Sequence, residues 1–330
     1  MSEKENILIT GGAGYIGSHI VRDLGEKGFN PVVLDNLSTG NRQSLLYGEL
    51  IEGDVNDEKL VSRIIKKYDI KSVIHFAAFI QVEESVKNPF KYYENNSIKS
   101  FFFIKTCVEN GIENFVFSST AAIYGMPDEI PVKERSPLLP INPYGRSKLF
   151  TEMVLKDISE VNDNFNYIAL RYFNVAGADP KGRIGQNYEK PTHLITLALR
   201  AALGDYPSLK IFGTDYDTPD GTAIRDYIHV DDLSKAHLLS LDYLKNKKKS
   251  NIFNCGYGMG LSVSEVIGTV KKITGIDFKV ENAPRRAGDP PKLIADSSLI
   301  KETLKWIPES DNIDKIIENS WLWEKKLKGI

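Results

Sequence analysis

Cysteine is scarce in this chain. Cys107 and Cys255 are the only two among 330 residues, and both lie in apolar surroundings. Neither has another cysteine or a histidine nearby at a spacing that suits a metal ion. We therefore expect two buried thiols, a reducing compartment and no metal site.

The chain also lacks a strong charge and a long apolar run. Its formal net charge is -2, and its one basic cluster, Lys245–Lys249, has the composition of a solvated helix end, which argues against nucleic acid as a partner. The apolar stretch near the N-terminus is short and is interrupted by glycines, so it fits neither a signal peptide nor a membrane span. We expect a cytoplasmic protein without a membrane partner.

A glycine motif stands out among what is present. The apolar run 6–10 is followed by Gly11, Gly14 and Gly17 and then by an amphipathic segment, a pattern typical of strand, tight turn and helix. Glycine permits the turn and a close approach to a pyrophosphate, which the helix N-terminus attracts. Asp35 ends the next apolar run, where a carboxylate would meet the adenosine ribose and favour NAD over NADP. The alternative for Asp35 is an ordinary turn residue.

Length and patterning indicate an α/β fold. A chain of 330 residues exceeds the usual size of one domain. We expect a Rossmann-like, doubly wound parallel sheet over residues 1–175 and a smaller, interleaved C-terminal α/β substrate domain over 176–330. Because 251–255 is expected to be a further strand of the first sheet, residues 226–256 should return to it. Helices are expected at 58–68, 89–110, 144–160, 231–246, 262–273 and 312–328.

Several expected strands end in polar or small residues. The carboxyl ends of parallel strands face the ligand crevice, so Asp54 is placed to bond the adenine amino group. Ala77 and Ala78 follow the apolar strand 72–76, where small side chains let a cofactor lie close. His75 lies inside that strand and is expected to be a hydrogen-bonded core residue rather than a catalytic one.

One pair of residues carries the chemistry. Tyr144 and Lys148 are four apart on an expected helix and so share a face. A free tyrosine has a pKa near 10 and is a poor base at neutral pH. A neighbouring ammonium, together with the positive nicotinamide of an oxidised cofactor, would lower the pKa of Tyr144. Thr120, after the strand 114–118, could hold a sugar hydroxyl and relay its proton.

Two expected helices are apolar on more than one face. Phe101, Phe102 and Phe103 cannot share one helical stripe, and the helix 144–160 carries Phe150 and Met153 outside its main apolar face. A partner subunit would cover them and favours a homodimer. Burial within one subunit is the alternative.

These features resemble the extended short-chain dehydrogenase/reductase family along essentially the whole chain. Within that family the resemblance narrows to the UDP-glucose 4-epimerases. The motifs that carry it are Leu170–Asn174, Ile211–Gly213, the run Asp-Gly-Thr-x-x-Arg-Asp-Tyr at 220–227, and 283–289.

The resemblance assigns residues to two ligands. It implies that NAD contacts Gly11, Gly14, Tyr15, Ile16, Gly17, Asp35, Asn36, Asp54, Val55, Phe76, Ala77, Ala78, Asn95, Ser118, Tyr144, Lys148 and Tyr172. It implies that a UDP-hexose contacts Thr120, Tyr144, Asn174, His193, Leu194, Phe212, Arg225, Tyr227, Arg286, Asp289 and Leu293. In this assignment Asn174 and the two arginines meet the diphosphate, Phe212 bounds the uracil and Asp289 accepts from the ribose. The alternative for each arginine is a surface ion pair, for Arg225 with a neighbour such as Asp226.

The implied reaction is reversible C4 inversion of UDP-glucose and UDP-galactose in nucleotide-sugar metabolism, with NAD resident. Tyr144 would take the 4-hydroxyl proton while hydride leaves C4. The 4-keto sugar would turn over about its pyrophosphate link, and hydride would return to the opposite face. Tyr144, Lys148 and Thr120 are the implied catalytic residues.

Three positions depart from some members of the family. Thr120 stands where others have serine, which keeps the hydroxyl. Ile80 stands where some carry a lysine near the cofactor, which implies a weaker hold on NAD. Leu293 stands at a gate that is tyrosine in enzymes restricted to plain hexoses and smaller in those accepting N-acetylated sugars. Its intermediate bulk favours UDP-glucose and UDP-galactose and leaves N-acetylated sugars open.

Other functions occur on the same fold. A nucleotide-sugar dehydratase needs an acid and a base directly after its threonine, but Ala121 and Ala122 stand there and cannot move a proton. A UDP-uronic acid epimerase stays an alternative. A non-catalytic NAD-sensing protein is another, because fold alone does not fix function.

Overall fold

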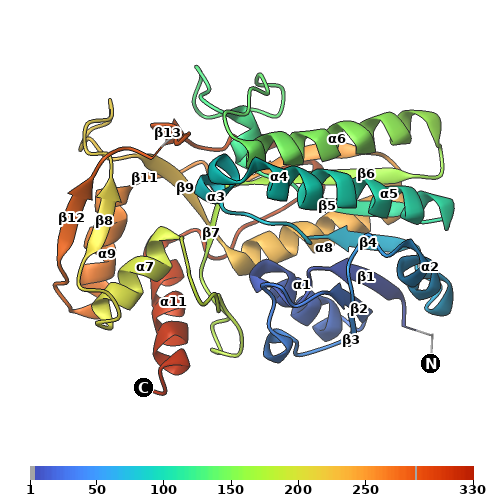
Figure 1. Ribbon diagram of the computed structural model, residues 1–330, viewed down its shortest axis with the longest axis horizontal. Helices are drawn as coiled ribbons and strands as arrows, with labels where there is room; N and C mark the ends of the chain where they lie inside the picture. Colours follow the sequence, from blue (N-terminus) through green and yellow to red (C-terminus); the bar gives the residue numbers. More distant parts are fainter. Residues whose placement is uncertain (1–3, 287) are drawn as a thin grey trace.

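A seven-stranded parallel sheet forms the larger half of the molecule in the computed structural model, which describes residues 4–286 and 288–330 (Figure 1). The strand order is β10-β6-β5-β4-β1-β2-β3, so the chain winds outward in both directions from the boundary between β1 and β4. A ligand crevice is expected at such a switch point. The strands are β1 (Asn6–Thr10), β2 (Asn30–Asp35), β3 (Glu49–Glu52), β4 (Ser72–His75), β5 (Asn114–Ser118), β6 (Asn166–Tyr172) and β10 (Asn251–Cys255).

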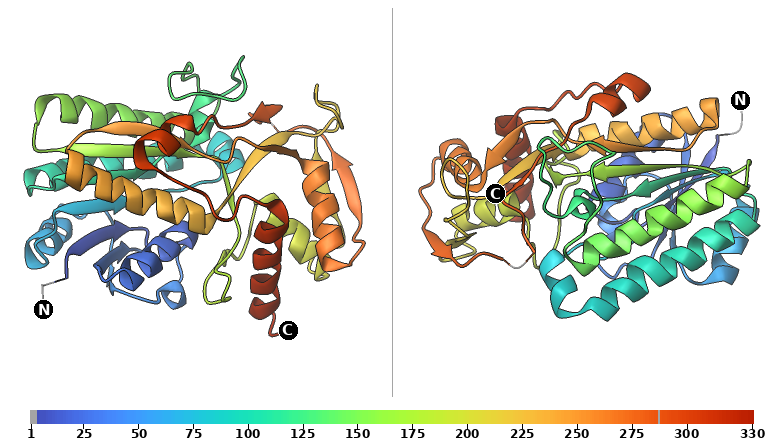
Figure 2. Two further views of the ribbon diagram at one scale, coloured as in Figure 1. Left: turned by 180° about the vertical axis from the view of Figure 1, so that it is seen from behind. Right: turned by 90° about the horizontal axis from the view of Figure 1, so that it is seen from above.

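Helices cover both faces of this sheet (Figure 2). Helices α1 (Tyr15–Glu26) and α8 (Val230–Lys247) pack together on one face, and α2 (Glu58–Lys67), α5 (Lys99–Glu109) and α6 (Pro143–Val161) cover the other. Ile7 and Ile9 belong to the core beneath α1, whereas Leu8 between them belongs to the core beneath α2 and α5. A strand buried on both faces must be apolar throughout, which explains the runs in the sequence. The Rossmann-like α/β fold is confirmed.

The helix expected at 89–110 has an irregular middle. It consists of α4 (Pro89–Tyr92), a π-helical stretch (Tyr93–Ile98) and α5. Within the π stretch, the side chain of Asn96 accepts from the backbone N–H of Phe79 and donates to its carbonyl, both at 2.9 Å. The wider turn therefore fixes the loop after β4, which also carries the short helix α3 (Val82–Lys87).

The C-terminal half holds two smaller sheets (Figure 1). The chain enters this half after β6. It returns to the large sheet through α8 and β10 and then enters the C-terminal half a second time. In one sheet β9 lies between β11 and β13 and also pairs with β7; in the other β8 pairs with β12. The elements are β7 (Asn174–Ala176), α7 (Leu194–Ala202), β8 (Leu209–Phe212), β9 (Ile224–His229), β11 (Gly260–Ser262), α9 (Val263–Thr274), β12 (Val280–Ala283), β13 (Lys292–Leu293), α10 (Ser298–Leu304) and α11 (Ile313–Leu327).

Three expectations from composition concern features of this structure. Cys107 and Cys255 are both buried and form no disulfide. Among the described residues, no helix is long and apolar enough to cross a membrane. Within residues 4–286 and 288–330, no group of three or more histidine, cysteine, aspartate or glutamate side chains is arranged to hold a metal ion.

Candidate active site

The glycine turn between β1 and α1 tolerates no side chain at two of its positions. A Cβ on Gly11, whose φ is +68°, would lie 2.7 Å from the backbone nitrogen of Ala77. A Cβ on Gly17 would lie 2.4 Å from the carbonyl oxygen of Gly11. Gly14 is the N-cap of α1 and offers no side-chain acceptor to the first turn of the helix. The N–H groups at this helix start are therefore left to a ligand such as a phosphate.

Asp35 ties the glycine turn to the loop after β2. Its Oδ2 accepts from the backbone N–H of Ala13 at 2.9 Å, and its Oδ1 accepts from Leu37 at 2.8 Å. Burial raises the pKa of Asp35, and these two hydrogen bonds act in the opposite direction. Each oxygen keeps a lone pair for a ribose hydroxyl.

A cavity of about 800 Å³ opens at this edge of the sheet. Every residue that the sequence analysis assigned to NAD lines it, from Gly11 in the glycine turn to Tyr172 at the end of β6. The residues fit an extended dinucleotide, because the cavity combines a glycine cradle, a helix N-terminus without a side-chain cap and a carboxylate at the end of β2.

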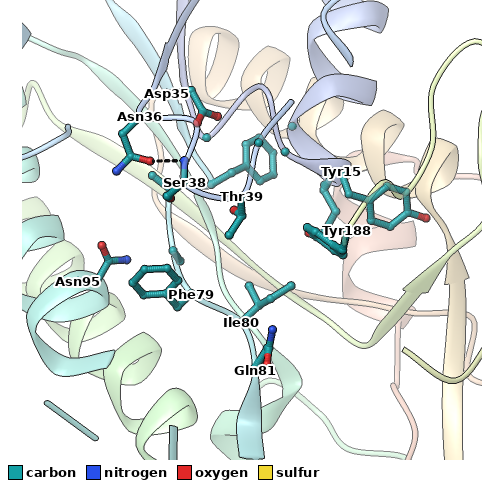
Figure 3. Close-up of a pocket in the computed structure, with 18 of the residues that line it drawn as sticks. Tyr15, Asp35, Asn36, Ser38, Thr39, Phe79, Ile80, Gln81, Asn95 and Tyr188 are labelled. Carbon is teal, nitrogen blue, oxygen red and sulfur yellow. Dashed lines mark hydrogen bonds between the residues drawn. The ribbon is translucent and has the colours of Figure 1, made fainter. Parts of the chain in front are cut away.

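Other lining residues were missed by the sequence analysis. Figure 3 shows Ser38 and Thr39 from the loop after β2, Phe79 and Gln81 from the loop after β4, and Tyr188 from the segment between β7 and α7. The first two loops follow strands that end at the crevice, so their position in the chain was a usable signal. The segment around Tyr188 carries no such signal.

Asp54 lines the cavity and has two donors close by. Its Oδ2 accepts from Lys99 Nζ at 2.8 Å and from the amide of Asn36 at 3.2 Å. Burial acts to raise the pKa of Asp54, but Lys99 and the other donors outweigh it and lower the pKa. The carboxylate thus lines the cavity as the partner of a lysine that the sequence analysis did not single out. Ile80 also lines the cavity and lies next to Gln81 in Figure 3.

Tyr144 and Lys148 lie in the first turns of α6 and both line the cavity. Burial raises the pKa of Tyr144, and a hydrogen bond with the side chain of Thr120 acts in the opposite direction. Lys148 Nζ donates to the carbonyl oxygen of Ser118 at 2.8 Å. Burial lowers the pKa of Lys148 to about 7, with Glu152 acting to raise it. Burial thus outweighs the effect of Thr120, and the lowering of the pKa of Tyr144 by Lys148 together with a bound nicotinamide stays a prediction.

Two histidines near the site are neutral. His75 bonds Thr10 Oγ1 at 2.6 Å and Ser100 Oγ at 3.0 Å, and burial lowers its pKa to about 3. It is the hydrogen-bonded core residue that the sequence predicted. Burial likewise lowers the pKa of His193 to about 4, and this ring stacks on Tyr188 at the cavity wall.

The residues assigned to the UDP-sugar gather around β9. Strand pairing sets Arg225 opposite Leu293 and Tyr227 opposite Asn174. Leu293 is buried and packs in one cluster with Ala121 and Tyr124, directly after Thr120. Of this group Tyr144 and His193 line the large cavity, and Thr120 does not. His193, Leu194, Asn174 and Tyr227 meet at a smaller adjacent cavity.

The arginines have other partners than expected. Arg225 pairs with Asp289, not with Asp226, which instead accepts three backbone N–H groups. Arg286 lies 3.9 Å from the centre of the Phe212 ring. Its Nε is buried and has no acceptor among the described residues. This N–H group could therefore donate to a ligand beside the Phe212 ring. Ala287, in the same motif, lies outside the described residues.

Comparisons with known proteins agree with this site. A family model for the NAD dependent epimerase/dehydratase family matches residues 7–256. The UDP-glucose 4-epimerase of Azospirillum brasilense is 47% identical over 323 residues, which cover 98% of this chain and 92% of that protein.

Solved structures are similar over nearly the whole chain. One is a UDP-glucose 4-epimerase from Brucella ovis in complex with NAD, 43% identical with a TM-score of 0.93 over 96% of this chain and 97% of that one. Another is a UDP-Glc/GlcNAc 4-epimerase from Campylobacter jejuni, 50% identical with a TM-score of 0.85 over 98% and 99%.

Proposed function

This chain belongs to the NAD dependent epimerase/dehydratase family, and we propose that it inverts C4 of a UDP-hexose at the cavity, with Tyr144, Lys148 and Thr120 as its catalytic residues. It is an NAD-dependent enzyme whose reaction is the 4-epimerisation of UDP-glucose. The observation that carries the assignment of residues is the single cavity, which is lined by all the residues assigned to NAD and by Tyr144.

Bound NAD would supply the acceptor for the C4 hydride and would return that hydride to the opposite face of the sugar. Tyr144 takes the proton of the 4-hydroxyl and gives it back after the sugar has turned over. Thr120, hydrogen-bonded to Tyr144, holds the same hydroxyl and relays its proton. Lys148, fixed on the carbonyl of Ser118, supplies the positive charge that favours the phenolate.

The nucleotide half of the substrate is held by residues of the smaller sheets. Arg286 donates to the diphosphate from beside Phe212, where its Nε has no acceptor among the described residues. Arg225 and Asp289 are already paired and act together, one toward the diphosphate and one toward the ribose. Firm nucleotide contacts leave the sugar free to turn over. The division into a cofactor domain of residues 1–175 with 226–256 and a substrate domain follows this separation of ligands.

Leu293 limits the space for the sugar of the substrate. It lies in one cluster with Phe173 and with Ala121, the residue after Thr120, so its bulk limits the space beside the catalytic threonine. We assign UDP-glucose and UDP-galactose as the substrates on this basis.

The enzyme is a cytoplasmic homodimer in this proposal. Phe101 and Phe102 on α5 and Phe150 and Met153 on α6 are 38% to 57% exposed, and these two helices are packed neighbours. Burial within one chain, the alternative from the sequence, does not cover them. A second copy would bury this patch, which we call the α5–α6 patch. The buried thiols suit a reducing compartment.

A coupled assay tests the function. UDP-galactose is supplied to the purified protein and UDP-glucose is detected with a UDP-glucose dehydrogenase, in parallel with the N-acetylated pair of substrates. Turnover of UDP-galactose supports the assignment, and preference for it over the N-acetylated sugar supports the role of Leu293. A protein that binds NAD but converts none of the four sugars would contradict the proposal.

A further inference from the structure

A third buried residue continues the catalytic face of α6. Tyr144, Lys148 and Glu152 are spaced four apart, so their side chains lie along one side of the helix. All three are less than 10% exposed. The first two line the cavity, whereas Glu152 lies beyond its lining and is not among the residues assigned to either ligand. A carboxylate so deeply buried needs a physical reason.

The carboxylate of Glu152 is fully engaged. Arg171 on β6 donates from Nε to both of its oxygens, at 3.1 and 3.2 Å, and from a terminal nitrogen to Oε2 at 2.6 Å. Ser119 Oγ donates to Oε1. Arg171 in turn donates to the hydroxyl of Tyr124 at 3.0 Å and to the carbonyl of Glu134 at 2.9 Å. The ion pair is therefore held in one geometry from several elements.

Stability alone is a weak reason for such a pair. Replacing a buried ion pair by apolar side chains of similar volume is often neutral or stabilising. The hydrogen bond between Ser119 and Glu152 suggests a role in the reaction, because Ser119 lies between two residues that contact the catalytic pair Lys148 and Tyr144. Its neighbour Ser118 supplies the carbonyl that accepts from Lys148, and its other neighbour, Thr120, hydrogen-bonds Tyr144.

The charges around Lys148 also point to Glu152. The groups near its ammonium are the ring of Phe117, at 4.9 Å, and the neutral His75, and the phenols of Tyr144 and Tyr172 line the same cavity. The other charged group nearby, Arg171, is paired with Glu152. Glu152 is the charged group that acts to raise the pKa of Lys148, against the lowering by burial.

We propose that Glu152 is a positioning residue for the reaction: locked by Arg171, its carboxylate fixes the strand end Ser118–Thr120 through Ser119 and places a negative charge one helical turn from Lys148. This inference rests on the proposed function for its kinetic consequence. The effect of Glu152 on Lys148 does not depend on the reaction and can be measured without turnover.

The test compares E152Q with E160Q. Glu160 lies two turns further along α6, is exposed and pairs with Lys156, so its variant makes the same chemical change without the buried contacts. The alkaline limb of the kcat profile for UDP-galactose should move to lower pH by about one unit in E152Q, and kcat on that limb should fall about tenfold. The KM should change less than about twofold, and E160Q should match the unmodified enzyme.

A second readout needs no turnover. Lysines labelled with ¹³C at Cε are titrated by NMR in the holoenzyme, with Lys148 assigned by its loss in K148M. In E152Q the Lys148 titration should move to lower pH, and in E160Q it should stay. If E160Q and the unmodified protein fail to turn over UDP-galactose, the proposed function is wrong, but this titration still decides the role of Glu152.

Loss of one partner of a buried pair can unfold a protein, so the double variant E152M/R171M is made in parallel. It removes both charges and should fold with the Lys148 titration moved to lower pH, by less than in E152Q because no unpaired Arg171 charge is left. An unmoved Lys148 titration in a folded variant would overturn the proposal, even if kcat fell, because the role would then be structural. If neither variant folds, the pair is needed for the fold and the proposal is likewise wrong.

Discussion

Lys148 donates a hydrogen bond of 2.8 Å from Nζ to the carbonyl oxygen of Ser118, at the end of the central strand β5. The contact holds the ammonium at the wall of the cavity, 3% exposed, one helical turn from the Tyr144 hydroxyl. Such burial has a cost that the sequence does not reveal, because a charged lysine is best solvated by water.

The first prediction concerns that cost. Burial lowers the pKa of Lys148 from 10.5 to about 7. Below pH 7 the lysine is charged in both states and the folded protein carries the full penalty, on the order of 5 kcal/mol. Between pH 7 and 10.5 the unfolded chain binds more protons, so stability rises with pH. K148M should therefore raise the free energy of unfolding most below pH 7, and its advantage should vanish toward pH 10.5.

Urea denaturation of the holoenzyme at several pH values measures this difference. K156M, at an exposed position of the same helix, is the control and should show no such pH-dependent gain. K148M should also lose turnover. A gain in stability that did not change with pH would contradict the assignment of a buried, titrating ammonium.

The second prediction concerns the base. Y144F removes the hydroxyl that hydrogen-bonds Thr120 and keeps the ring. We expect kcat to fall by about 10² to 10⁴-fold, the range for loss of general acid–base catalysis, while KM for UDP-galactose stays within about threefold. Steady-state kinetics in the coupled assay measure both constants. Turnover at the original rate would show that another group takes the proton.

The third prediction concerns the diphosphate. Arg286 lies over Phe212 with a buried Nε that has no acceptor among the described residues, whereas its neighbour Arg285 is exposed and pairs with Asp215. A charge-assisted hydrogen bond contributes about 1.5 to 3 kcal/mol. R286M should thus raise KM about 10- to 100-fold. R285M should change it by less than about threefold, and equal effects of the two would rule out a specific role for Arg286.

The fourth prediction concerns the glycine turn. A Cβ at Gly17 would lie 2.4 Å from the carbonyl oxygen of Gly11, so G17A must displace the turn. The variant should be purified with little bound NAD, as measured by the absorbance of cofactor released on denaturation. G268A is the control, since nothing lies within 4 Å of its Cβ on α9, and it should keep its NAD and gain about 0.5 to 1 kcal/mol in stability.

The fifth prediction concerns the α5–α6 patch. F102E/F150E places two charges on it and should turn a dimer into a monomer in light scattering, with the circular dichroism spectrum unchanged. I307E makes the same kind of change at a residue that is 74% exposed after α10, and it should leave the dimer intact. A monomeric unmodified enzyme would refute the homodimer.

The sequence predicted most of the cofactor side of the site, because local features determine it. Gly11 and Gly17 are required by the backbone itself. Asp35 ends one strand and Ala77 follows another, and the carboxyl ends of these strands must share one edge of a parallel sheet. The loop residues Phe79 and Tyr188 were missed. Their approach to the cavity depends on contacts far along the chain, such as that of Asn96 with the backbone of Phe79.

The sequence by itself determined the fold class, the crevice and the spacing of Tyr144, Lys148 and Glu152, since strand and helix periodicity fix which residues share a face. Only the tertiary structure decided what surrounds those groups. It turned Lys148 toward Ser118, paired Arg225 with Asp289 instead of Asp226, and buried Tyr144 so deeply that its pKa rises. Burial and charge pairing depend on elements distant in sequence, and desolvation, which governs the pKa of a buried group, has no local signature in the chain.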